Sequence, residues 1–285
     1  MVKIAIFALT RGYSTFQDYN LLIQRTCSLR LQIEPSTKHS FDFLLFHEGN
    51  INAEHQQRLQ ILSGISIKFI DIHAMFTSWN ETNPYVSPVG PLGSFLVKAS
   101  PSDIDTGIAW PTGYRNMCFF YAHLCIDILD TLGYELALRV DEDCTISGSL
   151  NLAWDELVNN KNSLIGTPAM FKESHAKTNK VLPKLLKLSG VSFWHKWSAL
   201  YEHNSPMVYS NVNLYFIRNI CASLHCRRFR NTIEASAIIY RFRVGDAPLL
   251  FWLSQLHENG LQLLNKINYK HHSHTYEVED GKVIC

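Results

Sequence analysis

The chain has 285 residues, of which 46% are hydrophobic and 18% charged, and its formal net charge is +1. This composition is that of an ordinary globular protein with a substantial core, and no repeat, low-complexity linker or domain boundary is visible. The near-zero charge argues against a nucleic-acid-binding surface or a polybasic membrane tether, so we expect no nucleic acid among its partners.

The first part of the chain alternates apolar runs with amphipathic segments. We predict strands over 3–9, 41–46 and 65–72, and helices over 19–30 and 53–62. This order favours an α/β fold with a doubly wound, mostly parallel sheet flanked by helices. The first strand is not followed by G-x-G-x-x-G, which disfavours a dinucleotide site. Its apolar run is too short for a signal peptide or a membrane span, so we expect no membrane span.

The segment 73–113 has no clear period and is rich in Pro, Ser, Gly and Asn, which is typical of a lid or binding loop. Part of it, at 94–99, is compatible with a short helical turn. In the remaining chain we predict helices over 115–132, 152–159, 180–188, 192–201 and 246–257. We predict strands over 136–140 and 163–166. The segment at 209–213 is followed by a helix to about 226, and the stretch from there to 240 has little pattern.

The seven cysteines show no regular spacing and no C-x-x-C pair. A disulfide framework or a structural zinc site would call for tighter pairing. We therefore expect reduced, mostly buried thiols, as in a cytosolic protein.

The strand predicted over 136–140 ends in three consecutive acids, Asp141, Glu142 and Asp143. Three adjacent carboxylates repel one another and gain little from a packed core. At the end of a buried strand they suit a divalent cation such as Mn²⁺ or Mg²⁺, which takes hard oxygen ligands and can neutralise a diphosphate. A solvated acidic turn is the alternative for this D-x-D pattern taken alone.

Five short blocks carry chemically competent residues, namely Gly113-Tyr-Arg-Asn-Met-Cys118, Arg139-Val-Asp-Glu-Asp143, Ser210-Asn-Val-Asn213, Gly245-Asp-Ala-Pro248 and Asn268-Tyr-Lys-His271. Their order and spacing resemble the fungal-type α-1,2-mannosyltransferases of glycosyltransferase family fifteen, Golgi enzymes with a GT-A fold that use GDP-mannose and Mn²⁺. That family has Y-R-x-M-C, R-V-E-P-D, S-N-F-E, G-D-A-P and G-Y-x-H blocks. The resemblance implies a single GT-A domain over 1–285, with a nucleotide-sugar-binding half over 1–143 and an acceptor-binding half over 144–285.

The resemblance also implies a metal site. Asp141 matches the family's metal-binding Glu and His271 its metal-binding His, so we expect Asp141, Asp143 and His271 to hold Mn²⁺ or Mg²⁺. Arg139 lies two residues before Asp141, so its side chain would point the same way along a strand and stabilise phosphate charge. A solvated tail is the alternative for His271.

Further roles in donor binding and catalysis follow from the same blocks. Tyr114 and Arg115 match the family's active-site Tyr and its neighbour, and we place them, together with Arg11, at the nucleotide sugar. The alternative for Tyr114 is a packed aromatic at a helix start. Asp246 would bind acceptor hydroxyls or act as a base, with a helix N-cap as the alternative. Tyr114, Asp246 and Asn213 are the expected catalytic residues.

The sequence departs from the family pattern at two positions within the blocks. Glu142 stands where the family has Pro and adds a carboxylate near the metal. Asn213 stands where the family has its candidate nucleophile, a Glu, and an amide cannot form a stable glycosyl ester. We therefore expect front-face transfer, in which the donor phosphate helps to deprotonate the acceptor and the Asn213 amide oxygen steadies the oxocarbenium-like sugar.

The expected function is that of a retaining, metal-dependent glycosyltransferase, which moves a hexose from a nucleoside diphosphate sugar to a glycan acceptor hydroxyl. Mannose from GDP-mannose is the first candidate. Because we see no membrane anchor before the domain, we expect a cytoplasmic protein, free or peripheral to a membrane-bound glycan assembly. Two alternatives stay open: another metal-dependent nucleotide enzyme such as a nucleotidyltransferase, and a non-catalytic carbohydrate-binding domain on a degenerate transferase fold.

Overall fold

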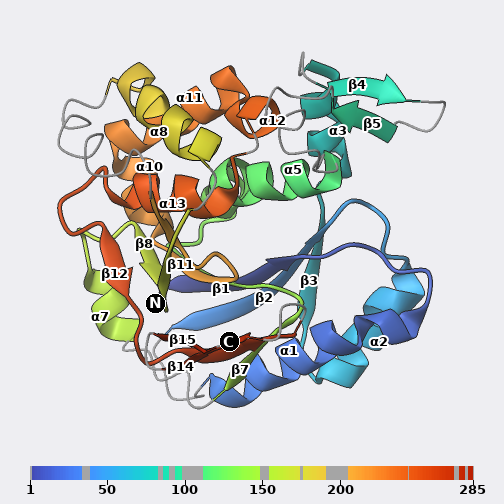
Figure 1. Cartoon of the computed structure of the whole chain (residues 1–285). Coiled ribbons are helices and arrows are strands. Elements are labelled where there is room, and N and C mark those ends of the chain that lie inside the picture. The colour runs from blue at the N-terminus through green and yellow to red at the C-terminus, as the bar shows by residue number, and fades with distance from the viewer. Residues whose placement is uncertain are drawn as a thin grey trace.

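A seven-stranded sheet forms the centre of the molecule in the computed structural model (Figure 1). Its strands run in the order β12 (Leu261–Leu263), β8 (Ile165–Thr167), β11 (Val212–Tyr215), β6 (Leu136–Val140), β1 (Lys3–Leu9), β2 (Ser40–His47) and β3 (Ile67–Asp71). Only β11 runs antiparallel to its neighbours, β6 and β8, and the other pairs are parallel. The α/β fold with a mostly parallel sheet is therefore confirmed.

The structure describes residues 2–33, 39–82, 86–89, 94–97, 112–147, 154–173, 176–190, 205–242, 244–272, 276–279 and 282–284. The helix predicted over 192–201 lies outside these residues. No helix within the described part of the chain combines the length and the apolar character needed to cross a membrane.

The strand order changes direction at β1. The chain runs from β1 outward to β2 and β3, and then returns with β6 on the other side of β1. In an open sheet of this kind the carboxyl ends of the two strands at the change of direction border a crevice that binds ligands. Here β1 ends at Leu9 and β6 ends at Val140. The segment 10–13 and the acidic turn 141–143 therefore meet at this crevice.

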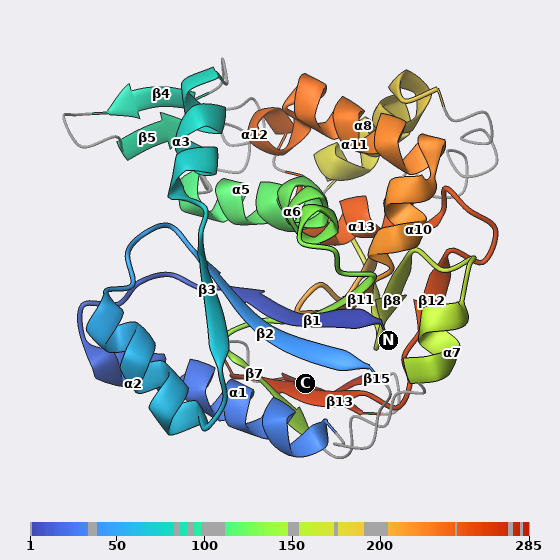
Figure 2. The same cartoon turned by 180° about the vertical axis from the view of Figure 1, so that it is seen from behind.

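One face of the sheet carries a layer of helices (Figures 1 and 2). Ala5 and Phe7 of β1 point into this layer and are fully buried there. The layer comprises α3 (His73–Thr82), α5 (Thr112–Phe119), the π-helical turn η2 (Phe120–Leu124), α6 (Cys125–Thr131), α8 (Ala176–Leu188), α10 (Ile217–Ala222), α11 (Leu224–Ser236), α12 (Ile238–Phe242) and α13 (Asp246–Ser254).

The opposite face is covered by helices and a small antiparallel sheet (Figure 2). Ile4 and Ile6 alternate with Ala5 and Phe7 and pack on this side, as the two-residue period of a strand requires. The covering elements are the 3-10 helix η1 (Phe16–Tyr19), α1 (Asn20–Gln32), α2 (Ala53–Ser63), α7 (Trp154–Asn159), and the sheet of β15 (Lys282–Ile284), β14 (Tyr276–Glu279), β13 (Asn268–His271) and β7 (Cys144–Ser147).

The described residues also form two antiparallel sheets of two strands each. One pairs β9 (Met170–Lys172) with β10 (Pro206–Val208), and the other pairs β4 (Val86–Val89) with β5 (Ser94–Val97). The short turn expected at 94–99 is therefore wrong, because β5 is held in a strand by β4. The segment 73–113 also begins with α3, which its composition did not reveal.

Most of the predicted elements lie where the sequence places them, but the short strands β7, β9, β10, β12, β13, β14 and β15 have no counterpart among the predictions. The stretch up to 240 that has little pattern contains α11 and α12. In α11 the buried Cys226, Phe229 and Ile233 follow the three- to four-residue spacing of a helix face. Six cysteines are described; all are free, and Cys27 and Cys221 are the two among them that are not buried. The expectation of reduced, mostly buried thiols holds for these six.

The loop after β1 depends on a close backbone approach. A Cβ at Gly12 would overlap the carbonyl of Asn50, whereas a Cβ at Gly113 in α5 would meet open space. We expect Gly12→Ala to lower the free energy of unfolding by about 1–3 kcal/mol, because backbone atoms must move. The matched control Gly113→Ala should be neutral or stabilising by up to about 1 kcal/mol. Urea unfolding followed by circular dichroism checks both, and equal effects would contradict this account.

Candidate active site

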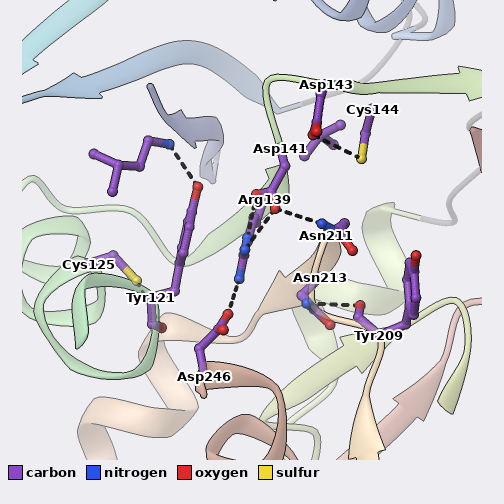
Figure 3. A network of polar contacts seen from close by, with 12 residues as sticks. Tyr121, Cys125, Arg139, Asp141, Asp143, Cys144, Tyr209, Asn211, Asn213 and Asp246 are labelled. Atoms are coloured by element: carbon purple, nitrogen blue, oxygen red, sulfur yellow. Dashed lines mark hydrogen bonds and ion pairs between the residues drawn. The ribbon is translucent and has the colours of Figure 1, made fainter. Parts of the chain in front are cut away.

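A buried arginine stands at the centre of the site, at the end of β6 (Figure 3). Arg139 donates from Nε and Nη2 to the two carboxylate oxygens of Asp141, at 2.6 and 2.8 Å, and from Nη1 to Asp246 at 2.5 Å. Its guanidinium also lies over the ring of Tyr121, 3.3 Å from the ring centroid. Two carboxylates and an aromatic face thus compensate a charge that has lost its water.

Local structure explains why these groups meet. Arg139 and Asp141 are two residues apart along an extended chain, so their side chains point to the same side of the sheet. Asp246 is the first residue of α13, and the helix cap is Gly245. The N-cap alternative for Asp246 is therefore wrong. The ion pair with Arg139 joins the start of α13 to the end of β6.

Asp141 is held on two sides. Besides the Arg139 contacts, its Oδ2 accepts a hydrogen bond from Nδ2 of Asn211 at 3.1 Å. Burial raises the pKa of the Asp141 carboxyl, and the Arg139 guanidinium acts in the opposite direction. The expected contact of Asp141 with a metal stays a prediction, and the carboxylate keeps lone pairs for it besides those that accept these hydrogen bonds.

Asp143 faces a different partner. Nε2 of His271 lies 3.1 Å from Oδ2 of Asp143, and the backbone N–H of His272 donates to the Asp143 carbonyl at 2.9 Å. The contact arises because β13 pairs with β7 so that His271 lies opposite Cys144, the residue after Asp143. The ligand atoms of Asp143, Cys144 and His271 all lie within 4.8 Å of one another. A carboxylate and an imidazole at this spacing fit a divalent cation.

Glu142, the residue between the two aspartates, points to the loop after β1. Its carboxylate accepts hydrogen bonds from the Thr10 hydroxyl and, at 2.8 Å, from the Tyr13 hydroxyl. Burial raises the pKa of Glu142, and these hydrogen bonds oppose that shift. Burial, with the Glu142 charge as a second cause, raises the pKa of Tyr13 to about 12. The residue at the family's Pro position thus fixes the loop 10–13 to the acidic turn.

Two cavities of about 460 Å³ each meet at the acidic turn. Glu142 and Asp143 line both of them. The first cavity is also lined by residues that include Tyr114, Arg139, Asp141, Glu173, Tyr209, Asn211, Asp246 and His271. The second is completed by Arg11, Tyr13, Asp18, Leu21 and Leu22.

Most of the predicted site residues are brought together here. Tyr114 is 41% exposed and lines the first cavity, so it is not a fully packed aromatic. The electrostatic interaction with the neighbouring Cys118 and burial both raise the pKa of Tyr114, which carries its proton at neutral pH. Arg11 lines the second cavity and its guanidinium lies 4.9 Å from the Tyr13 ring centroid. The roles of Tyr114 and Arg11 at the nucleotide sugar stay predictions.

Two predicted residues lie apart from the cavity linings. Arg115 is buried, and its Nη1 donates to the carbonyls of Ile239 and Tyr240 at 3.1 and 2.7 Å, which favours a structural role in place of donor binding. Asn213 is also fully buried, opposite Arg139 in the ladder between β11 and β6. Its Nδ2 donates to the Tyr209 carbonyl, and its Oδ1 has no hydrogen-bond partner within the described structure.

Sequence reasoning missed several residues of the site. Tyr121 supports Arg139 and accepts a hydrogen bond from the Leu9 N–H at 2.9 Å, but its sequence context is only that of an apolar helix. Asn211 belongs to the Ser210–Asn213 block, and that motif was a signal that could have identified it. Glu173, at the end of β9, lines the first cavity and has no motif around it.

No protein-family model matches the sequence, and its comparison with curated proteins finds no significant match. Solved structures, in contrast, are clearly similar. Ktr4p, a mannosyltransferase from S. cerevisiae in complex with GDP, is 13% identical with a TM-score of 0.72, over 97% of this chain and 72% of that chain. Core-mannan synthase A from Aspergillus fumigatus, in an Mn/GDP form, is 13% identical with a TM-score of 0.66, over 94% and 74%.

The chain has the GT-A glycosyltransferase fold. Mouse xyloside xylosyltransferase 1 is a more distant structural neighbour, at 13% identity and a TM-score of 0.53 over 93% of this chain and 85% of that chain. The resemblance to the fungal mannosyltransferases seen in the five blocks is confirmed at the level of the GT-A fold. At this identity the likeness shows the fold alone.

The Arg139 ion pairs lead to a test of stability against pH. We expect Arg139→Met to lower the free energy of unfolding by about 3–5 kcal/mol near pH 7, because two buried carboxylates lose their cation. Losing Arg139 also raises the pKa of Asp141 further above its unfolded value, so the folded variant binds protons more tightly than the unfolded chain. Its deficit relative to wild type should therefore shrink as the pH falls to about 5.

Urea unfolding at both pH values measures the deficit. The exposed Arg228 on α11 provides a matched control, and Arg228→Met should change stability by no more than about 0.5 kcal/mol at either pH. A deficit for Arg139→Met that grows on acidification would overturn the assignment of buried, charged partners.

Proposed function

We propose that this protein is a retaining, metal-dependent glycosyltransferase that transfers a hexose from a nucleoside diphosphate sugar to a glycan hydroxyl. GDP-mannose is the first candidate for the donor. The observation that carries the proposal is the acidic turn between two cavities, at the carboxyl ends of β1 and β6, with His271 brought against Asp143. The GT-A fold and the glycosyltransferase structures similar to it support the same reaction class.

The cavity beside the loop 10–13 suits the nucleoside part of the donor. Tyr13 offers an aromatic ring and Arg11 a cation, while Leu21 and Leu22 add apolar surface. Glu142 holds the loop in place through Thr10 and Tyr13. A base and ribose bound here would direct the diphosphate toward Asp143, because Asp143 lines both cavities.

Asp143 and His271 are the residues that would hold Mn²⁺ or Mg²⁺, with Asp141 as a further predicted ligand. Such an ion stabilises the charge that develops on the departing nucleoside diphosphate. Arg139 acts mainly as a support in this proposal. Its guanidinium is held by Asp141 and Asp246, so it orients both carboxylates and adds positive potential near the phosphates.

The first cavity would hold the transferred sugar and the acceptor. Tyr114 carries its proton and can donate a hydrogen bond there, and the Asp246 carboxylate can accept one from an acceptor hydroxyl. In front-face transfer the acceptor oxygen bonds to the anomeric carbon on the side from which the phosphate leaves. The acceptor proton passes to a phosphate oxygen. Asn213 lies beside Arg139 in the sheet, and in this proposal its unpaired Oδ1 adds negative potential that steadies the developing oxocarbenium ion.

The proposal is consistent with a single domain whose residues 1–143 bind the donor and whose residues 144–285 bind the acceptor. Both parts contribute strands to the central sheet, since β6 ends the first part and β11 belongs to the second. A cytoplasmic location, free or peripheral to membrane-bound glycan assembly, also remains part of the proposal.

Donor choice and reaction class can be tested together. With Mn²⁺ present we expect GDP to bind at least about tenfold more tightly than UDP, about 1.4 kcal/mol, and neither to bind well after chelation. Calorimetry measures these affinities. Incubation with GDP-mannose and simple mannosides should release GDP and yield a mannosylated product. If UDP binds tenfold more tightly than GDP, the donor is a UDP-sugar and not GDP-mannose. Release of pyrophosphate would indicate a nucleotidyltransferase. Binding with neither transfer nor donor hydrolysis would indicate a non-catalytic domain.

Neighbouring histidines give a matched pair for the metal site. His271→Ala should weaken Mn²⁺ and GDP affinity together by about 10–100-fold, because a lost ligand loosens the ion that holds the diphosphate. His272→Ala should change them less than about threefold, since Nε2 of His272 contacts the Thr145 hydroxyl at 2.8 Å and lies outside the Asp143 group. Calorimetry with Mn²⁺ and GDP measures the affinities of both variants. Equal losses of affinity in His271→Ala and His272→Ala would count against this site.

A further inference from the structure

A buried thiol adjoins the proposed metal site. Cys144 has no exposed surface, and its Sγ lies 3.9 Å from Oδ1 of Asp143. It stands directly opposite His271 in the antiparallel pair of β7 and β13. Residues opposite one another in such a pair project from the same face of the sheet with neighbouring Cβ atoms. Cys144 and His271 therefore present sulfur and nitrogen to the same point.

The third member of the group is supplied by the turn before β7. Asp143 precedes Cys144, and its carboxylate reaches Nε2 of His271 at 3.1 Å. The three ligand atoms lie within 4.8 Å of one another. A tetrahedral zinc shell with bonds of about 2.0–2.3 Å places ligand atoms roughly 3.3–3.8 Å apart. Side-chain rotations that move these atoms by about 1 Å would thus bring sulfur, nitrogen and oxygen around one ion.

The composition of this group differs from that of a magnesium or manganese site. Mg²⁺ and Mn²⁺ favour oxygen ligands, whereas thiolate and imidazole favour Zn²⁺ and ions of similar softness. One thiolate, one imidazole and one carboxylate also leave a fourth tetrahedral position open, as in catalytic zinc sites.

We propose that Cys144 is a third protein ligand of this site, and that with Asp143 and His271 it forms a site for a borderline-soft divalent ion such as Zn²⁺. On binding, the S–H bond of Cys144 breaks, a sulfur–metal bond forms and the proton passes to solvent. Asp143 lines both cavities and His271 lines the first, so a diphosphate bound there would supply an oxygen as the fourth ligand. That last role rests on the proposed transferase function, but the ligand set does not.

Cobalt serves as a spectroscopic probe for the sulfur ligand. The metal-free 285-residue chain is titrated with Co²⁺, and a thiolate-to-cobalt charge-transfer band in the near ultraviolet is expected. Cys144→Ser should remove the band and weaken Zn²⁺ binding at least tenfold, measured by competition with a chromophoric chelator. The same variant should change Mn²⁺ affinity less than threefold, because Mn²⁺ depends little on sulfur.

Cys226→Ser is the matched control, since Cys226 is equally buried but lies in α11, outside the Asp143 group. It should keep both the band and the Zn²⁺ affinity. Absence of the band in the wild-type protein would overturn the proposal even if Cys144→Ser fails to fold. Persistence of the band in a folded Cys144→Ser would do the same.

The transferase proposal is judged separately by GDP release and product formation. A cobalt–thiolate band without transfer would reject the proposed function alone. Transfer without the band would reject Cys144 as a ligand and leave the proposed function in place.

Discussion

The site is organised around the charge of Arg139, which is 1% exposed and must be neutralised within the fold. Asp141 provides two oxygens from the same strand and Asp246 provides one from α13. Because a buried cation with one missing partner costs several kcal/mol, the end of β6 and the start of α13 are fixed relative to each other. The first cavity lies between these two elements, so its shape depends on this ion-pair network.

The same constraint separates the roles of three adjacent carboxylates. Asp141 turns inward to Arg139, Glu142 is bound by the hydroxyls of Thr10 and Tyr13, and Asp143 faces His271. Each carboxylate has its own polar partner, which relieves the repulsion that three acids in a row would otherwise suffer. Glu142 then links the acidic turn to the loop after β1, and only Asp143 and Asp141 remain for a cation.

The C-terminal part of the chain completes the site through backbone pairing. β13 adds to β7 with His271 opposite Cys144, and this register decides which side chains share the space beside Asp143. A shift of one residue would turn His271 away and bring in Lys270 or His272 from the other face. The sulfur of Cys144 enters the group by the same register, which gives the site a softer ligand set than its carboxylates alone suggest.

The sequence by itself determined the alternation of strands and helices, the parallel sheet, the acidic turn at the end of β6 and the five blocks that indicate a GT-A fold. These are local signals, since each depends on apolar periodicity or on neighbouring residues. Only the tertiary structure decided which side chains that are distant in the sequence contact one another. Arg139 forms ion pairs with Asp141 and Asp246. Arg115 donates hydrogen bonds to backbone carbonyls at a place apart from the cavities, and Cys144 lies opposite His271 in the small sheet. Such pairings depend on strand register and burial, which no local pattern encodes.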